Sequence, residues 1–304
     1  MAISRGYNVT NFHAVVNGMN GGYLTQFGPP TYEGDAIKQA LGPDGVTKMM
    51  VGKPKIGDAK CSYNISEAGP LIDLMNQILK KNVTHFDAYV ALGNQDYKIQ
   101  RAISMLGCLP KELGFSKLES KDGKKLFEVN LTFAVEDMKY EKGGDAIKSN
   151  LSNKAKSWLC AHFHPVGIFG GIPPQSITAI DLCKYTAKIS EEHTGMLRQP
   201  TRQAAAWEVA GHKIEGQPSG FEAAKDHVVK CLYDGEINEG DFVDWSVNIM
   251  APNNKDIIGE VVFIQSAPQK FTWAPELKGG GDGMATWTID CITEEMRIEP
   301  KHKA

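Results

Sequence analysis

The chain has 304 residues, of which 42% are hydrophobic and 23% charged, and its formal net charge is −3. This length accommodates two hydrophobic cores of ordinary size. The near-neutral charge argues against a protein built mainly to hold nucleic acid, which normally has a strong basic excess. The 31 glycines and 15 prolines indicate many turns and hence many short strands.

No segment approaches the roughly 20 consecutive apolar residues that a membrane helix needs, and residues 1–7 lack the apolar core of a secretion signal. Six cysteines are scattered along the chain without a Cys-x-x-Cys pair. We therefore expect synthesis in the cytosol, no binding of the chain itself to a membrane, and reduced, mostly buried thiols.

Alternating apolar residues and turn signals predict a first series of β-strands. In chain order these strands lie at residues 11–18, 23–27, 59–65, 86–92 and 98–105. A long polar connection is expected at 34–48, and residues 109–115 are expected to cross over to the next strand.

One helix interrupts this series. Ser66 is a good N-cap, and residues 67–81 predict an amphipathic helix. Its apolar face consists of Leu71, Leu74, Met75, Ile78 and Leu79.

After a turn at 121–124, the last strand of this half alternates over a long stretch, so its two faces differ. The apolar face consists of Phe127, Val129, Leu131, Phe133 and Val135. The polar face consists of Glu128, Asn130, Thr132 and Glu136. A face this polar on so long a strand is half solvated.

The second half repeats the order of the first. A polar segment at 143–154 leads us to predict a first domain at 1–143, a linker at 144–157 and a second domain at 158–304. The expected helix at 220–232 has Phe221, Val228, Val229 and Leu232 on or near its apolar side. Strands of the second half are expected at 162–169, 178–189, 202–209, 242–250 and 257–265, and a last strand from 287 after a Gly-rich turn at 278–283. The strand at 202–209 is expected to take the place that 59–65 has in the first half.

The last strands of the two halves end alike. Residues 136–141 and 294–299 both read Glu, acid, Met, base, apolar residue, Glu, and 299 minus 141 gives a period of 158 residues. A repeat of this length indicates a duplicated domain. We therefore predict a mainly β (α+β) fold of two tandem β-sandwich or barrel domains, each flanked by one amphipathic helix.

The order of elements resembles that of the tail tube proteins of contractile bacteriophages, relatives of the hemolysin-coregulated protein tubes of type VI secretion. The resemblance is strongest over residues 12–141, in the Val-Gly-Lys-Pro-Lys step at 51–55, the strand into a helix after Ser66, the turn at 96–98 and the ending at 136–141. It implies domains whose strands join those of ring neighbours around a lumen, in rings that stack into a tube. The connection at 34–48 would correspond to the family's loop that touches the adjacent ring.

Two such domains in one chain depart from the usual pattern. Either three chains supply six domains to a pseudo-sixfold ring, or six chains form the ring with the second domain outside, and we favour three. The candidate lumen-facing or ring-interface residues are Glu128, Asn130, Thr132, Glu136, Thr286, Thr288 and Asp290.

The resemblance implies a structural, non-enzymatic protein without a cofactor, forming the inner tube of a contractile phage tail. The resemblance also implies assembly in the host bacterial cytoplasm and a place in the virion tail. The implied partners are copies of itself, the sheath, the tape-measure protein, baseplate proteins and the tail terminator, with DNA only in transit. Alternatives within the family are a tube-initiating baseplate protein and the tube of a non-viral contractile injection system.

A metal-dependent enzyme is the alternative from another class. His162 and His164 would point the same way from a strand, with Cys160 nearby and a further ligand needed from His193 or Cys183. The more economical interpretation is two histidines on a solvated strand. The paired acids at 136–137 and 294–295 are interpreted as solvated or interface groups, and a β-barrel nucleic-acid binder is disfavoured by the net charge.

Overall fold

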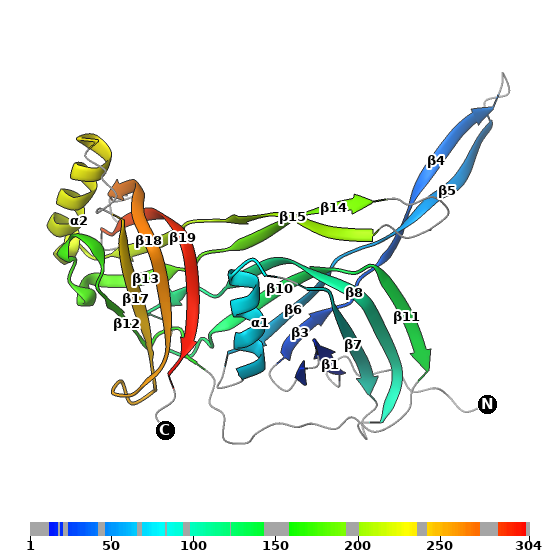
Figure 1. Ribbon diagram of the computed structural model, residues 1–304, viewed down its shortest axis with the longest axis horizontal. Coiled ribbons are helices and arrows are strands. Elements are labelled where there is room, and N and C mark those ends of the chain that lie inside the picture. The colour runs from blue at the N-terminus through cyan, green and yellow to red at the C-terminus, as the bar shows by residue number, and fades with distance from the viewer. Residues whose placement is uncertain are drawn as a thin grey trace, which may run out of the picture.

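The computed structural model describes residues 12–17, 19–20, 24–41, 46–65, 69–82, 84–93, 98–121, 123–142, 158–192, 201–235, 242–273 and 285–301. The fold is mainly β, as predicted, with two large sheets and two extended hairpins (Figure 1). All of the strand pairs in the described residues are antiparallel. No described helix is both long enough and apolar enough to cross a membrane.

The first sheet belongs mostly to the N-terminal half. Its order is β2 (Met19–Asn20), β1 (Phe12–Val16), β7 (Phe86–Gly93), β8 (Ile99–Phe115), β10 (Glu128–Ala134), β6 (Ala59–Asn64) and β3 (Leu24–Gly28). Strand β11 (Asp137–Lys142) pairs with the first part of β8. Helix α1 (Gly69–Leu79) buries Leu74, Met75, Ile78 and Leu79, in agreement with the predicted apolar face.

The second sheet repeats the order that the first sheet has from β1 to β3. Its strands are β12 (Phe163–Val166), β17 (Val243–Met250), β18 (Ile257–Trp273), β19 (Trp287–Pro300), β16 (His212–Gly216) and β13 (Ile177–Asp181), with β9 (Leu118–Glu119) of the first half beside β13. Helix α2 (Phe221–Val228) continues as a π-helical turn at Val229–Tyr233. Short 3-10 turns lie at Phe169–Gly171, Pro174–Ser176 and Pro218–Gly220.

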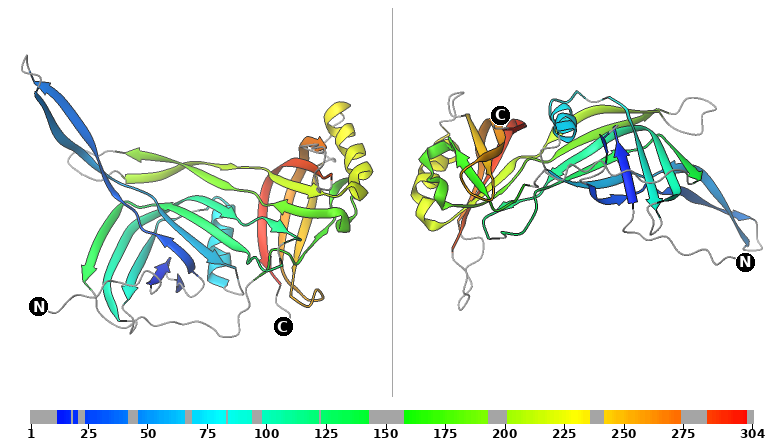
Figure 2. Two further views of the ribbon diagram at one scale, coloured as in Figure 1. Left: turned by 180° about the vertical axis from the view of Figure 1, so that it is seen from behind. Right: turned by 90° about the horizontal axis from the view of Figure 1, so that it is seen from below.

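Each half also carries a long two-stranded hairpin. The hairpin of β4 (Tyr32–Leu41) and β5 (Val46–Ile56) projects away from the sheets, whereas that of β14 (Tyr185–Glu192) and β15 (Thr201–Val209) runs across the first half (Figures 1 and 2).

The register of pairing repeats between the halves. Glu141 pairs with Ala102 and Glu299 pairs with Glu260, so both partners are displaced by 158 residues. In the hairpins, Tyr32 pairs with Ile56 and Tyr185 pairs with Val209, a displacement of 153 residues. The two offsets allow a position in one half to be matched with its counterpart in the other.

The structure corrects several expectations about individual elements. Residues 34–48 include two paired strands instead of a connection, because a hairpin that leaves the sheet needs no apolar face. Residues 109–115 continue β8, because Pro110 lies where the register shifts and its missing N–H is tolerated. Residues 178–189 divide between β13 and β14.

Residues 202–209 do not take the place of 59–65. They form β15, the counterpart of β5, and β16 is the counterpart of β6. On the second helix, Val228 is buried as expected, but Val229 and Leu232 are exposed. Ser66, residues 94–97, the linker and the turn at 278–283 lie outside the described residues.

The apolar face of the long strand is the centre of the first core, as predicted. Phe127, Val129, Leu131, Phe133 and Val135 are all buried. They belong to one cluster of buried residues that extends into the second half, so the two halves are packed against each other.

Strand β8 turns at Gly107, which has a φ of 62°, and its counterpart Gln265 has a φ of 52°. In each half the N–H of this residue donates to an aspartate, at 3.2 Å from Gly107 to Asp87 and 2.8 Å from Gln265 to Asp244. The same left-handed turn is thus built from glycine in one half and glutamine in the other.

Gly107→Ala is expected to lower the free energy of unfolding by about 1–2 kcal/mol, because a Cβ at positive φ meets the following carbonyl oxygen and would also press on the Glu136 side chain. Gly114→Ala in the same strand has open space around the new Cβ and is expected to change stability by less than about 0.5 kcal/mol. Urea denaturation measures both, and equal effects would contradict the prediction.

Candidate assembly surface

Each half of the chain pairs one strand with a sheet edge of the other half. Strand β14 of the second half pairs with β8 of the first through Tyr185 with Leu113 and Thr186 with Glu112. In the other direction, β9 of the first half pairs with β13 of the second. The halves therefore meet as neighbouring parts of one sheet system, a contact that satisfies backbone groups at both edges.

Ion pairs support both of these edges. The Lys184 Nζ lies 2.7 Å from a Glu112 carboxylate oxygen, and the Lys117 Nζ lies 2.8 Å from Glu215. Burial alone would raise the pKa of Glu215, but hydrogen bonds from Lys117 and Lys213 hold it below its ordinary value. The side chains of both pairs are partly exposed, so the pairs align the edges more than they stabilise them.

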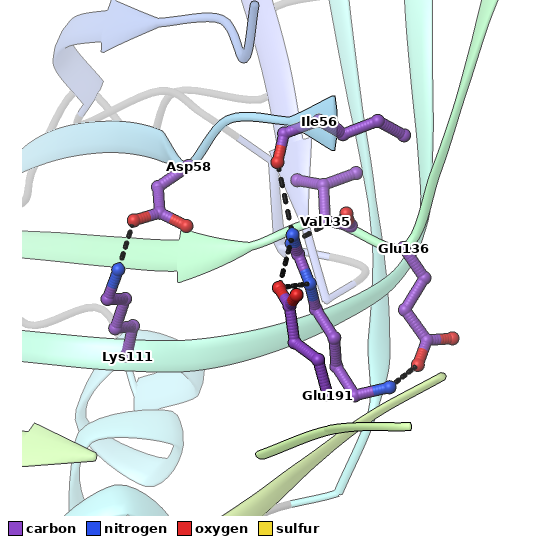
Figure 3. Close-up of polar contacts among 7 residues, drawn as sticks. Ile56, Asp58, Lys111, Val135, Glu136 and Glu191 are labelled. Atoms are coloured by element: carbon purple, nitrogen blue, oxygen red, sulfur yellow. Dashed lines mark hydrogen bonds and ion pairs between the residues drawn. The ribbon is translucent and has the colours of Figure 1, made fainter. Parts of the chain in front are cut away.

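Arg202 fixes the β14–β15 hairpin onto the first half (Figure 3). It is 7% exposed, and its guanidinium donates to the backbone carbonyls of Val135 at 2.9 Å and Ile56 at 3.1 Å. It also donates to the Glu191 carboxylate through Nε at 3.1 Å. A single buried cation therefore joins both strands of the hairpin to two segments of the other half.

The backbone of Arg202 is held as well. Its N–H donates to a Glu136 carboxylate oxygen at 2.7 Å, and its carbonyl oxygen lies 3.0 Å from the His85 Nε2. A further ion pair, between Lys111 and Asp58 at 2.5 Å, lies beside this contact (Figure 3). Glu136 thus lies at the contact between the two halves of the chain, and its place at a lumen or a ring interface stays a prediction.

Trp158 connects the two cores. Its ring stacks on Phe127 of the first half with centroids 6.2 Å apart, and its backbone bonds to Ile65 and Phe127 at 2.9 and 2.8 Å. On the other side the ring fills the space next to Gly259 of β18, where even a Cβ would collide with it. The close approach therefore requires glycine at position 259.

Helix α1 of the first half contacts β19 of the second (Figure 1). The Asn76 amide nitrogen donates to the Ile298 carbonyl at 2.9 Å, and its oxygen accepts from the Ile298 N–H at 3.3 Å. Both backbone groups of one residue are thus satisfied by one side chain.

The remaining candidates of the first half lie on the polar face of the sheet. Asn130 is exposed and its Oδ1 accepts from the Ser62 hydroxyl at 2.7 Å. Thr132 lies between Lys60 and Glu112 in the ladder, and Glu128 is half-buried opposite Asn64. Their assignment to a lumen stays a prediction.

In the second half the corresponding row carries alternating charges. Asp290 lies between Lys213 and Lys270 in the ladder, and Thr286 is partly exposed. Thr288 differs from the expectation, because it is only 8% exposed. This short side chain lies between Glu215 and Thr272 in neighbouring strands.

The histidines considered for a metal site do not converge with other ligands in the described residues. The His162 Nδ1 lies 2.5 Å from the Asn254 Oδ1, and His164 lies on the exposed side of β12. Cys160 is buried and its thiol donates to the Leu126 carbonyl. No group of three or more His, Cys, Asp or Glu in the described part of the chain is placed to hold a metal ion; His193 lies outside that part.

All six cysteines are buried. Burial raises the pKa of Cys61, Cys108 and Cys183 to about 12. These thiols therefore carry little thiolate at neutral pH, which limits their reactivity.

Arg202, Asn76 and Trp158 were not predicted from the sequence as contacts between the halves. An arginine within a polar hairpin has no distinctive local pattern, since the carbonyl partners of Arg202 lie far away in sequence. The signal that would have found it is an arginine whose counterpart in the other half, Met49, is apolar.

No protein-family model matches the sequence, and no curated protein matches it. Among solved structures, the chain is similar to a protein of the sheath-tube complex of an extracellular contractile injection system, PVC, in its extended state, with 16% identity and a TM-score of 0.40 over 46% of this chain and 95% of that one. A protein of the anti-feeding prophage tube-terminating cap has 14% identity and a TM-score of 0.40, over 47% and 95%. Hcp1 from Flavobacterium johnsoniae has 12% identity and a TM-score of 0.28, over 44% and 98%.

Proposed function

We propose that this chain is a structural protein that assembles with copies of itself into rings, stacked as the inner tube of a contractile machine. The observation that carries the proposal is the junction inside the chain. Two halves with the same strand order are joined edge to edge by β14 on β8 and β9 on β13. A chain built in this way occupies two neighbouring positions of a ring.

The outer edges support assembly beyond one chain. In the described residues, β3 pairs only with β6, and β18 beyond Ser266 pairs only with β19. These are the counterparts of the β13 and β8 edges that are joined within the chain. Two unlike open edges favour head-to-tail contacts, which close into a ring when the rotation per chain allows it.

The repeated order and register favour a tandem duplication, with two tube-like domains at 1–143 and 158–304 and a linker at 144–157. We infer three chains per pseudo-sixfold ring, because each chain would then supply two of six positions. The polar face with Glu128, Asn130, Thr132, Thr286 and Asp290 would line the lumen, as in large barrels whose interior holds solvent.

The proposed machine is a contractile phage tail, in which the tube passes DNA. A lumen with alternating charges would not retain DNA, because phosphate contacts with Lys and Arg dominate affinity. The proposed partners are the sheath, the tape-measure protein, baseplate proteins and the tail terminator, and the place of action is the virion tail after assembly in the bacterial cytoplasm. We propose no catalytic role.

Electron microscopy and mass photometry of the purified full-length protein test this proposal. We expect rings or stacked rings, with a ring mass of three times the 33.3 kDa of one chain. A protein that stays monomeric up to the highest soluble concentration would overturn it. Rings of six chains would overturn the stoichiometry, and particles whose tubes contain this chain in a single layer would assign it to the baseplate.

A further inference from the structure

We propose that a second copy of this chain binds its β4 and β11 side to the β18 and α2 side of the first, repeating between chains the junction that joins the two halves within one chain. The proposal rests on the ring proposed above and specifies the surfaces, the register and the order of halves. It follows from applying the internal offsets of 153 and 158 residues to the observed junction.

The hairpin bases of the two halves are equivalent. The Tyr32 hydroxyl donates to the Met138 carbonyl at 2.7 Å, and the Tyr185 hydroxyl accepts from the Met296 N–H at 2.8 Å. Met138 and Met296 are counterparts at the offset of 158. The start of β4 therefore contacts its own half at the position where the start of β14 contacts the second half.

The acceptor edge is equivalent as well. Within the chain, Tyr185 and Thr186 pair with Leu113 and Glu112. The counterparts of those two acceptors are Phe271 and Lys270, on the part of β18 that pairs only with β19 in the described residues. The proposed contact thus pairs Tyr32 with Phe271 and Glu33 with Lys270.

The acceptor edge is acidic at the junction within the chain and basic at the proposed contact between chains. This difference determines which half of the next chain can bind. Inside the chain, acidic Glu112 on the acceptor edge binds Lys184 at the base of β14. At the proposed contact the acceptor edge has basic Lys270, and the hairpin base has acidic Glu33. The wrong pairings bring like charges together, Glu33 with Glu112 or Lys184 with Lys270, and like charges on neighbouring strands are destabilising.

Exposed apolar side chains lie where this contact would cover them. Inside the chain, α1 covers β19 at Ile298, which is fully buried. The counterpart of Ile298 is Tyr140 on β11, which is 67% exposed, and the helix of the second half ends with Tyr233, which is 87% exposed. The same operation that places α1 on β19 places α2 and its π turn on β11 of the next chain.

The second junction lacks the Arg202 anchor. Its counterpart on the β4–β5 hairpin is Met49, an exposed residue, and Lys38 stands where Glu191 does. Glu294 retains the position of Glu136, whose carboxylate accepts from the hairpin backbone. The contact between chains is therefore expected to be weaker than the one within the chain, so it forms by assembly after each chain has folded.

Engineered disulfides test the register. Glu33→Cys with Lys270→Cys should form disulfides between chains on oxidation, since directly opposed residues in antiparallel strands lie about 4.5–5.5 Å apart, within the range a disulfide spans. The ladder on a non-reducing gel should end at three chains. The buried native thiols leave the background low, and Thr186→Cys with Glu112→Cys is the matched control that should close within one chain.

A charge exchange separates this contact from other modes of assembly. Lys270→Glu alone should reduce ring formation at least tenfold, and adding Glu33→Lys should restore it. Rings on electron micrographs without the Glu33–Lys270 disulfide would overturn the contact and leave the proposed function standing. Monomers with neither rings nor cross-links would overturn both, and a cross-link ladder extending beyond three chains would support the contact while contradicting the closed ring of three.

Discussion

Arg202→Met is expected to release the β14–β15 hairpin from the first half and to lower the stability of that contact by about 2–4 kcal/mol. The guanidinium donates hydrogen bonds to the backbone carbonyls of Ile56 and Val135. A buried acceptor that loses its donor lowers the free energy of unfolding by about 1–3 kcal/mol. Methionine fills a similar volume, so packing is largely kept, and the counterpart Met49 shows that a hairpin tolerates it. Hydrogen exchange of the amides in β14 and β15 measures the release, and urea denaturation measures the stability.

Lys188→Met on the same hairpin is the matched control. Lys188 pairs with Glu208, and both side chains are more than half exposed; such pairs contribute less than about 1 kcal/mol. We expect wild-type hydrogen exchange in this variant. If Arg202→Met also exchanged like the wild type, the hairpin would be held by its strand pairing with β8 alone, and the anchoring role of Arg202 would be wrong.

Local periodicity was sufficient to predict the core of the first half. The alternation from Phe127 to Val135 placed five apolar side chains on one face, and all five are buried. The spacing in residues 67–81 placed the apolar face of α1 correctly, because a helix or strand at the surface of a core must match its own period. The mainly β class followed from the same patterns.

Pairing partners could not be predicted in this way. Residues 109–115 contain Pro110 and read as a connection, yet they form the part of β8 that β14 joins, because the proline falls at a register shift. The β4–β5 hairpin read as a polar loop because the side chains of residues 32–38 and 49–51 are exposed and give no alternation of buried and exposed positions. The two errors have different causes: the end of β8 is specified by pairing with the distant strands β10 and β14, whereas β4 and β5 pair with each other and carry no alternating apolar signal.

For the candidate surface residues, too, the sequence predicted one property, the face of the sheet, but not another, the exposure of the side chain. Asn130 and Thr132 follow from alternation and lie on the polar face, whereas Thr288 has the same pattern and is buried. Exposure at that position depends on the side chains of β16 and β18, which reach it only through the sheet order. Sequence alternation thus predicts which face a residue is on, and the neighbouring strands decide whether that face is open.

Mild acid is expected to destabilise the second half through His212. The imidazole is 1% exposed and packs against Trp245 and Phe263, with ring centroids 5.2 and 4.4 Å away. The Thr293 hydroxyl lies 2.7 Å from its Nδ1. Burial lowers the pKa of His212 from 6.5 to about 3, because the interior disfavours the charged imidazolium.

Since the pKa of His212 is lower in the folded state than in the unfolded state, its contribution is fully present above pH 6.5 and is lost as the pH falls towards 3. Between pH 7 and pH 5 the unfolded chain binds the proton and the folded chain does not, so the free energy of unfolding should fall by about 2 kcal/mol. In urea denaturation at the two pH values, His212→Gln should lose this part of the decrease, even if it is less stable at pH 7. His164→Gln, at an exposed position of β12, should retain it. An unchanged decrease in His212→Gln would show that other groups cause the acid sensitivity and that the buried imidazole is not its source.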